Sequence, residues 1–364
     1  MKRLHRYVLG ELFNPLGLSL FLFTFVLLSR RLDDLVVLLN VQDVDYGVVV
    51  QVICLLLPFV MTMTLPMGLM IACLTVFSRW SSDRELLIMR TSGINPFRII
   101  KPLLVVAVVS TLLVMYCTTF LVPWTYSAFR KTMFTVAAQM TTQLKTNTFN
   151  PFGNNLMVYV RERGEKPGFY KGVTLFYTKD NQIQQMLTAR DGQVDVDIEN
   201  SAIHMALNEG TYYSADQKDI THFYIATFGQ WTSTENLGRI LKMPGNENRK
   251  PQELNLSELK SAISKKEGKD QRKLRVEYMK RFSMPFSCLV VTLMGISLGA
   301  MVHLKNKTLG FFFGVVLIGV YWILMSVGES LGIRGILPPE YSVWLPNIVL
   351  GGLGVWLTWK MCRQ

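Results

Sequence analysis

The chain has 364 residues, of which 50% are apolar and 18% are charged, and its formal net charge is +12. A soluble protein carries about 25% charged residues, so this composition favours a membrane protein, with a length sufficient for about two or three domain-sized units. Many basic residues flank apolar runs, which favours contact with an anionic bilayer surface or lipid, and we expect no nucleic acid partner.

The five cysteines are not spaced as a disulfide framework or a metal site. Four of them lie inside apolar runs and the polar middle of the chain has none; they are Cys54, Cys73, Cys117, Cys288 and Cys362. We interpret them as small buried hydrophobic residues and expect neither a metal nor another cofactor.

Six apolar segments are long enough to cross a bilayer, which requires roughly 20 residues. They are residues 12–28, 48–77, 102–123, 282–304, 309–327 and 343–359. The second contains Pro58 and Pro66, so we expect it to be tilted or kinked. The first follows basic residues, as a signal peptide does, but no small-x-small cleavage site follows it. We therefore interpret it as a retained helix.

The distribution of basic residues predicts the orientation. With the N-terminus in the cytoplasm, twelve Lys and Arg fall on cytoplasmic segments and three, Arg30, Arg31 and Arg334, on short outer segments. Both termini are then cytoplasmic. The basic run 265–281 falls outside, within a long translocated segment where this rule has little force. The expected organisation is three helices in residues 1–125, an outer domain in 126–275, and three helices in 276–364.

The outer domain shows the period of two that is typical of strands. We predict strands at residues 156–160, 173–177, 193–198, 202–207 and 223–228, with turn signals that include Asp191-Gly192 and residues 208–210. This spacing predicts an antiparallel sandwich or jelly roll. A helical lead-in is expected at 126–145, a polar linker at 242–250, and a charged helix at 257–277.

Catalytic and nucleotide-binding motifs are absent from the sequence. It contains no G-x-x-x-x-G-K-[ST] loop, no G-x-S-x-G elbow and no H-E-x-x-H motif. His204 and His222 lie on or beside predicted strands, where we expect a structural role. We therefore expect a subunit that is not an enzyme, with a partner supplying the energy for any vectorial work.

The loop between the second and third spans predicts a short helix at about residues 83–92. Ser82 and Glu85 fit a capping box, Gly93 fits a C-terminal cap, and Asn95-Pro96 fits the start of the next helix. An ABC permease needs such a rigid cytoplasmic element to dock into its ATPase, whereas the alternative is an ordinary interfacial helix.

The candidate ATPase-coupling residues of this helix are Asp83, Arg84, Glu85, Leu86, Met89 and Arg90. Glu85 is the expected main electrostatic contact, because it and Asp83 are the acidic residues of a basic loop. If Glu85 serves only as a cap, docking rests on Leu86, Ile88 and Met89.

Arg30 and Arg31, at the outer end of the first span, are candidate substrate-binding residues. Charge this close to the hydrocarbon is costly and often functional, and a guanidinium pairs with a phosphate bidentately. The alternative is a pair of snorkelling arginines that Asp33 and Asp34 neutralise.

Motifs in register along the chain extend this interpretation. They are Arg6-Tyr7, Leu65-Pro66, Asp83-x-Glu85-Leu86, Arg90-Thr91-Ser92-Gly93-Ile94, Glu277, Arg281, Pro285, Pro338-Pro339 and Leu345-Pro346-Asn347. In combination they resemble the lipopolysaccharide export permease family LptF/LptG (YjgP/YjgQ). The N-terminus and Arg30-Arg31-Leu32 look more like the F subunit.

The resemblance implies a polytopic α-helical protein of the bacterial inner membrane, with six transmembrane helices in a 3+3 order and a periplasmic antiparallel β domain resembling a jelly roll. It implies an ABC exporter in which LptF and LptG pair around a cavity, with an LptB ATPase dimer and LptC. Lipopolysaccharide would pass through the β domains to an LptA-type bridge. The alternatives are an ABC-linked protein that transmits force without carrying lipid, and a membrane scaffold without an ATPase.

Overall fold

The structure, a computed structural model, describes residues 2–30, 46–142, 144–152, 156–164, 168–179, 182–197, 202–215, 223–236, 251–301 and 307–363. These residues form two compact units. The helical unit takes its residues from 1–36, 53–126 and 251–364, and the β unit from 37–52 and 127–250.

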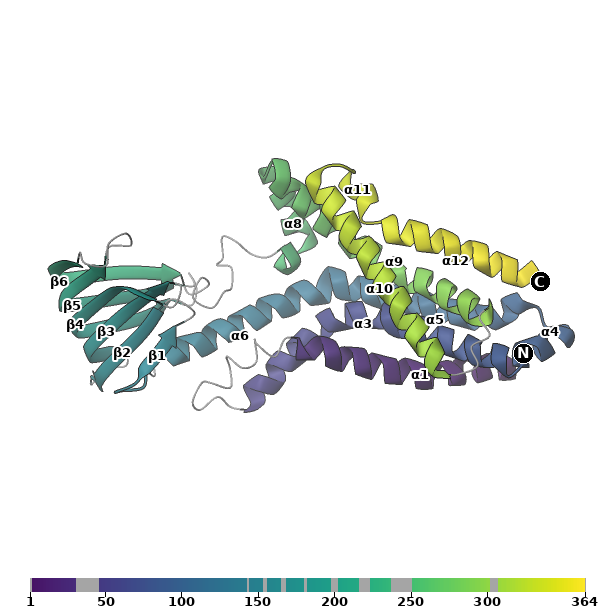
Figure 1. Ribbon diagram of the computed structural model, residues 1–364, viewed down its shortest axis with the longest axis horizontal. Coiled ribbons are helices and arrows are strands. Elements are labelled where there is room, and N and C mark those ends of the chain that lie inside the picture. Colours follow the sequence, from purple (N-terminus) through teal and green to yellow (C-terminus); the bar gives the residue numbers. More distant parts are fainter. Residues whose placement is uncertain are drawn as a thin grey trace. The chain divides into compact units, whose positions relative to one another are not determined.

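Long helices build the helical unit (Figure 1). They are α1 (Lys2–Ser29), α3 (Tyr46–Ser82), α5 (Pro96–Tyr116), α9 (Gly268–Met301), α10 (Lys307–Arg334) and α12 (Leu345–Arg363). Helix α6 (Val122–Thr142) starts in this unit, and its residues 127–142, like residues 46–52 of α3, belong to the β unit. Shorter elements are α4 (Glu85–Thr91), the π-helical turn η1 (Cys117–Leu121), the 3-10 turn η3 (Pro251–Glu253), α8 (Leu256–Lys265) and α11 (Pro339–Ser342). We call its two ends the α4 end and the α11 end; both chain termini lie at the α4 end (Figure 1).

Among the described residues, five helical stretches are long and apolar enough to cross a membrane, and they contain or overlap the first five predicted spans. The sixth predicted span is α12, a 19-residue helix outside this group. It still runs the depth of the unit, because Asn347 near its start bonds Ser283 while Met361 near its end packs in one cluster with Val8. The predicted 3+3 order around an inserted β domain is confirmed.

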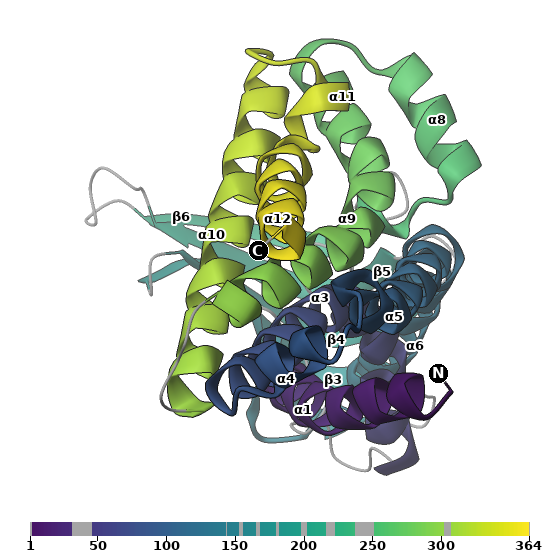
Figure 2. The same cartoon turned by 90° about the vertical axis from the view of Figure 1, so that its right-hand side faces the viewer.

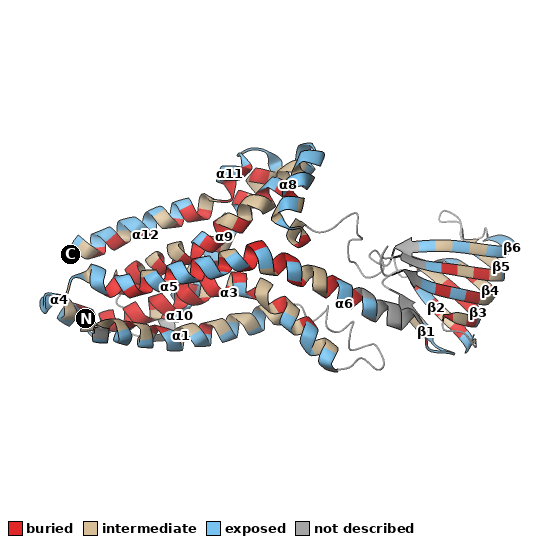
Figure 3. Cartoon of the chain, turned by 180° about the vertical axis from the view of Figure 1, so that it is seen from behind, coloured by how far each residue is buried: buried red, intermediate tan, exposed pale blue. Residues whose placement is uncertain are grey.

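Helix α9 lies at the centre of the unit (Figure 2) and is heavily buried (Figure 3). Its apolar window is 67% buried, against 11% for that of α1. Gly295 and Gly299 face α3, where an added Cβ would lie 2.9 Å from the Met70 carbonyl oxygen and 2.8 Å from that of Leu74. Small residues allow this approach, and membrane helices associate largely through such packing.

The predicted charged helix at residues 257–277 is wrong as one element. The chain forms α8, breaks after Lys265, and begins α9 at Gly268. Gly268 has a φ of +66°, a conformation that glycine adopts without a steric cost. The break turns the charged segment into a helical hairpin of α8 and the start of α9.

The β unit is one antiparallel sheet in the part of the chain that the structure describes. Its strands pair in chain order: β1 (Phe149–Phe152), β2 (Leu156–Arg163), β3 (Phe169–Lys179), β4 (Gln182–Asp197), β5 (Ala202–Ala215) and β6 (Phe223–Asn236). The predicted antiparallel β domain is therefore confirmed. The described strands form a meander, without the crossover between two sheets that a jelly roll contains in the strict sense.

The core of the sheet lies on one face. Leu156, Val158 and Val160 alternate with exposed residues along β2 and pack with residues of β3, β4 and β5. Tyr170 is fully buried there, and its hydroxyl accepts a hydrogen bond from the Leu144 N–H at 3.3 Å. Burial raises the pKa of the Tyr170 phenol, so this group stays neutral in the core.

Two predicted turns are wrong, because strands β4 and β5 continue through them. A Cβ at Gly192 would lie 2.8 Å from Leu207 and 2.9 Å from Val173, so this glycine makes room for neighbouring side chains. Glu209 has a φ of +49°, and the Arg190–Glu209 pair is missing from a β4–β5 register that is otherwise the same on both sides of it. The turn-like residues thus mark an irregularity inside a long strand.

We expect Gly299→Val to destabilise the helical unit by about 1–3 kcal/mol, because an overpacked contact forces α9 away from α3. The midpoint of thermal unfolding in detergent measures this effect. Gly352→Val on α12 is the control, since no atom lies within 4 Å of its Cβ position. Equal midpoints for the two variants would show that the α3–α9 contact is not tight.

Candidate functional site

Helix α4 is the short loop helix that the sequence predicts, but it starts differently. Ser82 is the last residue of α3, and α4 begins at Glu85. The first helical hydrogen bond runs from the Ile88 N–H to the Arg84 carbonyl at 3.0 Å. The predicted capping box of Ser82 and Glu85 is therefore wrong, because α3 continues further than expected. Asp83 and Arg84 form the exposed turn between the helices.

The C-terminal end of α4 follows the prediction. Gly93 has a φ of +77°, and the Ile94 N–H donates to the Met89 carbonyl at 3.1 Å, which is the pattern of a Schellman cap. Asn95 then caps α5, since its side-chain oxygen accepts from the Phe97 N–H at 2.9 Å. Two successive caps fix the path of the chain on this side of α4.

The two faces of α4 differ in burial. Leu86 is buried and Met89 packs against the same cluster, which also holds Phe77 and Trp80 of α3. Leu87 and Ile88 point away and are 57% and 61% exposed. Of the three apolar residues that the sequence offered for docking, Leu86 is buried, Met89 is half-buried and Ile88 is exposed. Leu87, which the sequence did not single out, is exposed beside Ile88.

Glu85 contacts a residue that is distant in the sequence. Its carboxylate accepts a hydrogen bond from the Tyr7 hydroxyl of α1 at 2.9 Å. The Tyr7 ring stacks on Trp80, with 5.9 Å between ring centroids and 15° between planes. Beside them, Arg79 pairs with Glu11 of α1 at 2.7 Å. The start of α4 is thus held to α1 by polar contacts as well as by apolar packing.

Sequence reasoning missed the role of Tyr7. The motif Arg6-Tyr7 carried part of the family resemblance, but nothing local connects it to a loop 78 residues away. The side chain of Arg90, another predicted coupling residue, lies outside the described residues. The structure therefore places Asp83, Arg84, Glu85, Leu86 and Met89 together on α4 and its preceding turn, with only some of them accessible.

Arg30 lies at the C-terminal end of α1, opposite the α4 end, and is exposed. The neighbouring turns of α1 present Phe21 and Phe25, which are 73% and 66% exposed. Arg31, Asp33 and Asp34 lie outside the described residues, so the arginine pair and its acidic neighbours stay a prediction.

The α11 end is tied together by polar side chains of α9. Lys280 pairs with Glu329 of α10 at 2.5 Å, and the Ser283 hydroxyl donates to the Val343 carbonyl. Arg281 is buried, and its guanidinium donates to backbone carbonyls of the η3 segment, the shortest bond being 2.6 Å to Leu254. Three nearby residues of one helix therefore fix α10, α11 and the segment that returns from the β unit.

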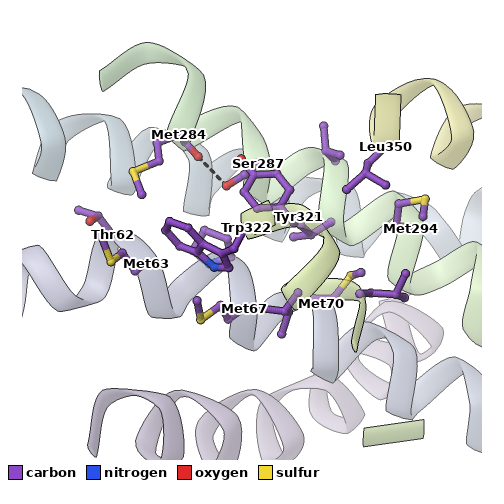
Figure 4. A pocket seen from close by; sticks show the side chains of 15 residues that line it. Thr62, Met63, Met67, Met70, Met284, Ser287, Met294, Tyr321, Trp322 and Leu350 are labelled. Carbon is purple, nitrogen blue, oxygen red and sulfur yellow. Dashed lines mark hydrogen bonds between the residues drawn. The ribbon is translucent and has the colours of Figure 1, made fainter. Parts of the chain in front are cut away.

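A small apolar cavity lies between α3, α9, α10 and α12 (Figure 4). Five methionines contribute to its lining: Met63, Met67, Met70, Met284 and Met294. Its volume of about 20 Å³ has room for about one water molecule, so it is too small for an acyl chain. Flexible methionine side chains adapt to such gaps, so α3, α9, α10 and α12 can shift relative to one another at this cavity without leaving a large void.

These features define a class of protein: a polytopic helical membrane protein with an inserted antiparallel β domain and a short capped helix between two spans. The family model described as lipopolysaccharide export system permease LptF/LptG matches residues 6–360. The chain belongs to this family, and it is accordingly a multi-pass inner-membrane protein. The family model covers both subunits, so the likeness to LptF stays a prediction.

One curated relative also matches. An uncharacterized protein of Rickettsia prowazekii (strain Madrid E), RP871, is 22% identical over 147 residues. The match covers 40% of this chain and 41% of that relative. The chain thus aligns with about two fifths of the relative's length.

We expect Tyr7→Phe to loosen α4, because the substitution removes the hydroxyl that binds Glu85 and keeps the stacked ring. Loss of this bond should cost about 1 kcal/mol of local stability. Hydrogen exchange of residues 85–94 should then accelerate about fivefold. Tyr116→Phe on the exposed face of α5 is the control, and equal exchange in both variants would show that Tyr7 does not hold α4.

Proposed function

We propose that this chain is a permease subunit of an ABC transporter that extracts lipopolysaccharide from the inner membrane and passes it to a periplasmic β bridge. The observation that carries the proposal is the family match over residues 6–360. In this proposal the chain is not itself an enzyme, and an LptB-type ATPase dimer hydrolyses ATP. The remaining partners are a second permease of the LptG or LptF type, LptC and an LptA-type bridge.

The proposed orientation puts the α4 end in the cytoplasm and the β unit in the periplasm. It is supported by the charge distribution along the sequence, and by the grouping of α4 with both chain termini in one end of the helical unit (Figure 1). Arg30 then lies at the periplasmic end of α1, at the level where a lipid presents its phosphates.

The proposed ATPase contact is the exposed face of α4, with Leu87 and Ile88 as its apolar part and Glu85 as its acidic part. Exposed apolar side chains on a helix outside the bilayer core favour a protein partner. The two caps and the anchoring of Leu86 keep this face rigid, which is what transmission of force requires.

The proposed bridge contact is strand β6. It pairs on one side only within the described sheet, has 14 residues, and exposes Tyr224 and Ile225. The other edge of that sheet, β1, has four residues. A long open edge is a template for a strand of another β protein, so crosslinks from β6 to a periplasmic partner should exceed those from β1.

Purification of the protein with its bound partners tests the proposal. We expect an ATPase and a second permease to copurify, with lipopolysaccharide identified by mass spectrometry of the extracted lipid. An ATPase without lipid would favour a transmitter of force that carries no lipid. Absence of any ATPase would favour a membrane scaffold.

We expect Glu85→Gln to weaken ATPase binding by about 2–5 kcal/mol, because a charge partner is lost at an interface. The glutamine keeps an oxygen that accepts the Tyr7 hydrogen bond, so α4 should stay in place. Binding of the purified ATPase to the reconstituted permease measures this effect. Unchanged binding would limit Glu85 to its local contact with Tyr7.

We expect Ile88→Ser to weaken ATPase binding by about 1.5–3 kcal/mol, the value of burying such a side chain. Ile336→Ser is a matched control, since Ile336 is 65% exposed at the α11 end. Equal binding by both variants would contradict docking through the apolar face of α4.

We expect the double variant Arg30→Glu, Arg31→Glu to lower lipopolysaccharide occupancy, because each charge-assisted bond to a phosphate contributes about 1.5–3 kcal/mol. Assembly with the ATPase should persist. The control is Arg98→Glu, Lys101→Glu at the α4 end. Occupancy equal to that of the control would favour snorkelling arginines.

A further inference from the structure

The α11 end carries exposed positive charge that none of the proposed contacts uses. Seven exposed Lys and Arg lie on α8, the start of α9 and the end of α10, against three exposed acidic residues there and on α11. The basic residues are Lys260, Lys265, Lys266, Lys269, Lys273, Arg275 and Arg334, and the acidic ones Glu267, Asp270 and Glu340. We call α8 and residues 268–281 of α9 the basic hairpin.

The basic hairpin is a fixed element of the helical unit. Leu259 buries the apolar side of α8. The side chains of Arg281, Gln271 and Arg272 donate to backbone carbonyls of the η3 segment, of α8 and of the last turn of α10. These bonds leave the lysines on the outside while they hold both helices of the hairpin in place.

The length of α9 sets the height of these charges above the bilayer. Its residues 282–301 carry no charge, and 20 residues span about 30 Å, the thickness of the hydrocarbon core. The preceding 14 residues of α9 extend about 21 Å further along the helix axis. For a helix along the bilayer normal, Arg275 then lies about 10 Å, and Lys269 about 20 Å, beyond the hydrocarbon.

A phospholipid presents its phosphates within a headgroup layer about 5–8 Å thick. That layer lies within reach of Arg275 but not of Lys269 and its neighbours. The basic side chains beyond the headgroup layer match a ligand whose anionic groups also extend beyond that layer. Membrane topology does not explain these basic residues, because the positive-inside rule concentrates Lys and Arg on the cytoplasmic side, not on the outer side.

We propose that the basic hairpin binds anionic saccharide groups of the exported glycolipid, above the phosphates at its headgroup level. This inference rests on the proposed function and adds a second contact region to the candidate site at Arg30. Lysine ammonium groups bind phosphate or carboxylate groups as point charges without a fixed geometry, which suits a variable saccharide. Because the side chains are exposed, the interaction weakens as salt rises.

The test compares two lipids on the complete transporter complex in detergent. One is rough-type lipopolysaccharide with a phosphorylated core, and the other is the lipid A released from it by mild acid. The variant carries Lys265→Gln, Lys266→Gln, Lys269→Gln and Lys273→Gln. We expect it to bind the lipopolysaccharide roughly tenfold more weakly than wild type at low ionic strength, and lipid A equally well.

The control variant removes the same charge at the α4 end through Arg3→Gln, Arg6→Gln, Arg98→Gln and Lys101→Gln, and should bind both lipids as wild type does. If the hairpin variant binds lipopolysaccharide as tightly as wild type does, the inference is overturned, and the basic hairpin is only a solvent-exposed charged surface. A matching loss of phosphatidylglycerol binding in nanodiscs would overturn it in favour of bilayer anchoring. If wild type binds neither lipid, the proposed function itself fails.

Discussion

The close approach of α9 to α3 is the contact on which the helical unit depends. Gly295 and Gly299 allow it, since a Cβ at either position would meet the backbone of α3. With α9 held centrally, its two ends serve different purposes. Lys280 and Arg281 bind α10 and the segment returning from the β unit. Ile296 and Ala300 pack in the cluster that holds Trp80 and so position the other end.

The α4 end shows how this packing prepares a surface for a partner. The Ser81 hydroxyl donates to the Ala300 carbonyl of α9 at 3.0 Å, so the last turn of α3 is fixed before α4 begins. Leu86 continues the same cluster, and Tyr7 joins α1 to Glu85. A shift of α4 would therefore move α1, and α1 is lightly packed towards Arg30 (Figure 3). Helix α1 therefore contacts the proposed ATPase-binding helix α4 through Tyr7 near one end and leads to Arg30 at the other.

The sequence predicts a local feature correctly where adjacent residues alone determine it, and it does not predict contacts between distant residues. The cap at Gly93 and the start of α5 depend on adjacent residues, and the apolar spans on composition, so both were predicted correctly. The bond between Tyr7 and Glu85 and the buried guanidinium of Arg281 require the tertiary arrangement. The sequence at Gly192 predicts a turn because this local signal does not reveal the side chains of Leu207 and Val173 that the glycine accommodates.

Depletion of this protein in its source bacterium tests the central claim most directly. We expect newly made lipopolysaccharide to accumulate in the inner membrane while phospholipid and membrane-protein insertion continue. The outer membrane should lose lipopolysaccharide over the same period. Normal delivery of lipopolysaccharide to the cell surface after complete depletion would contradict the account.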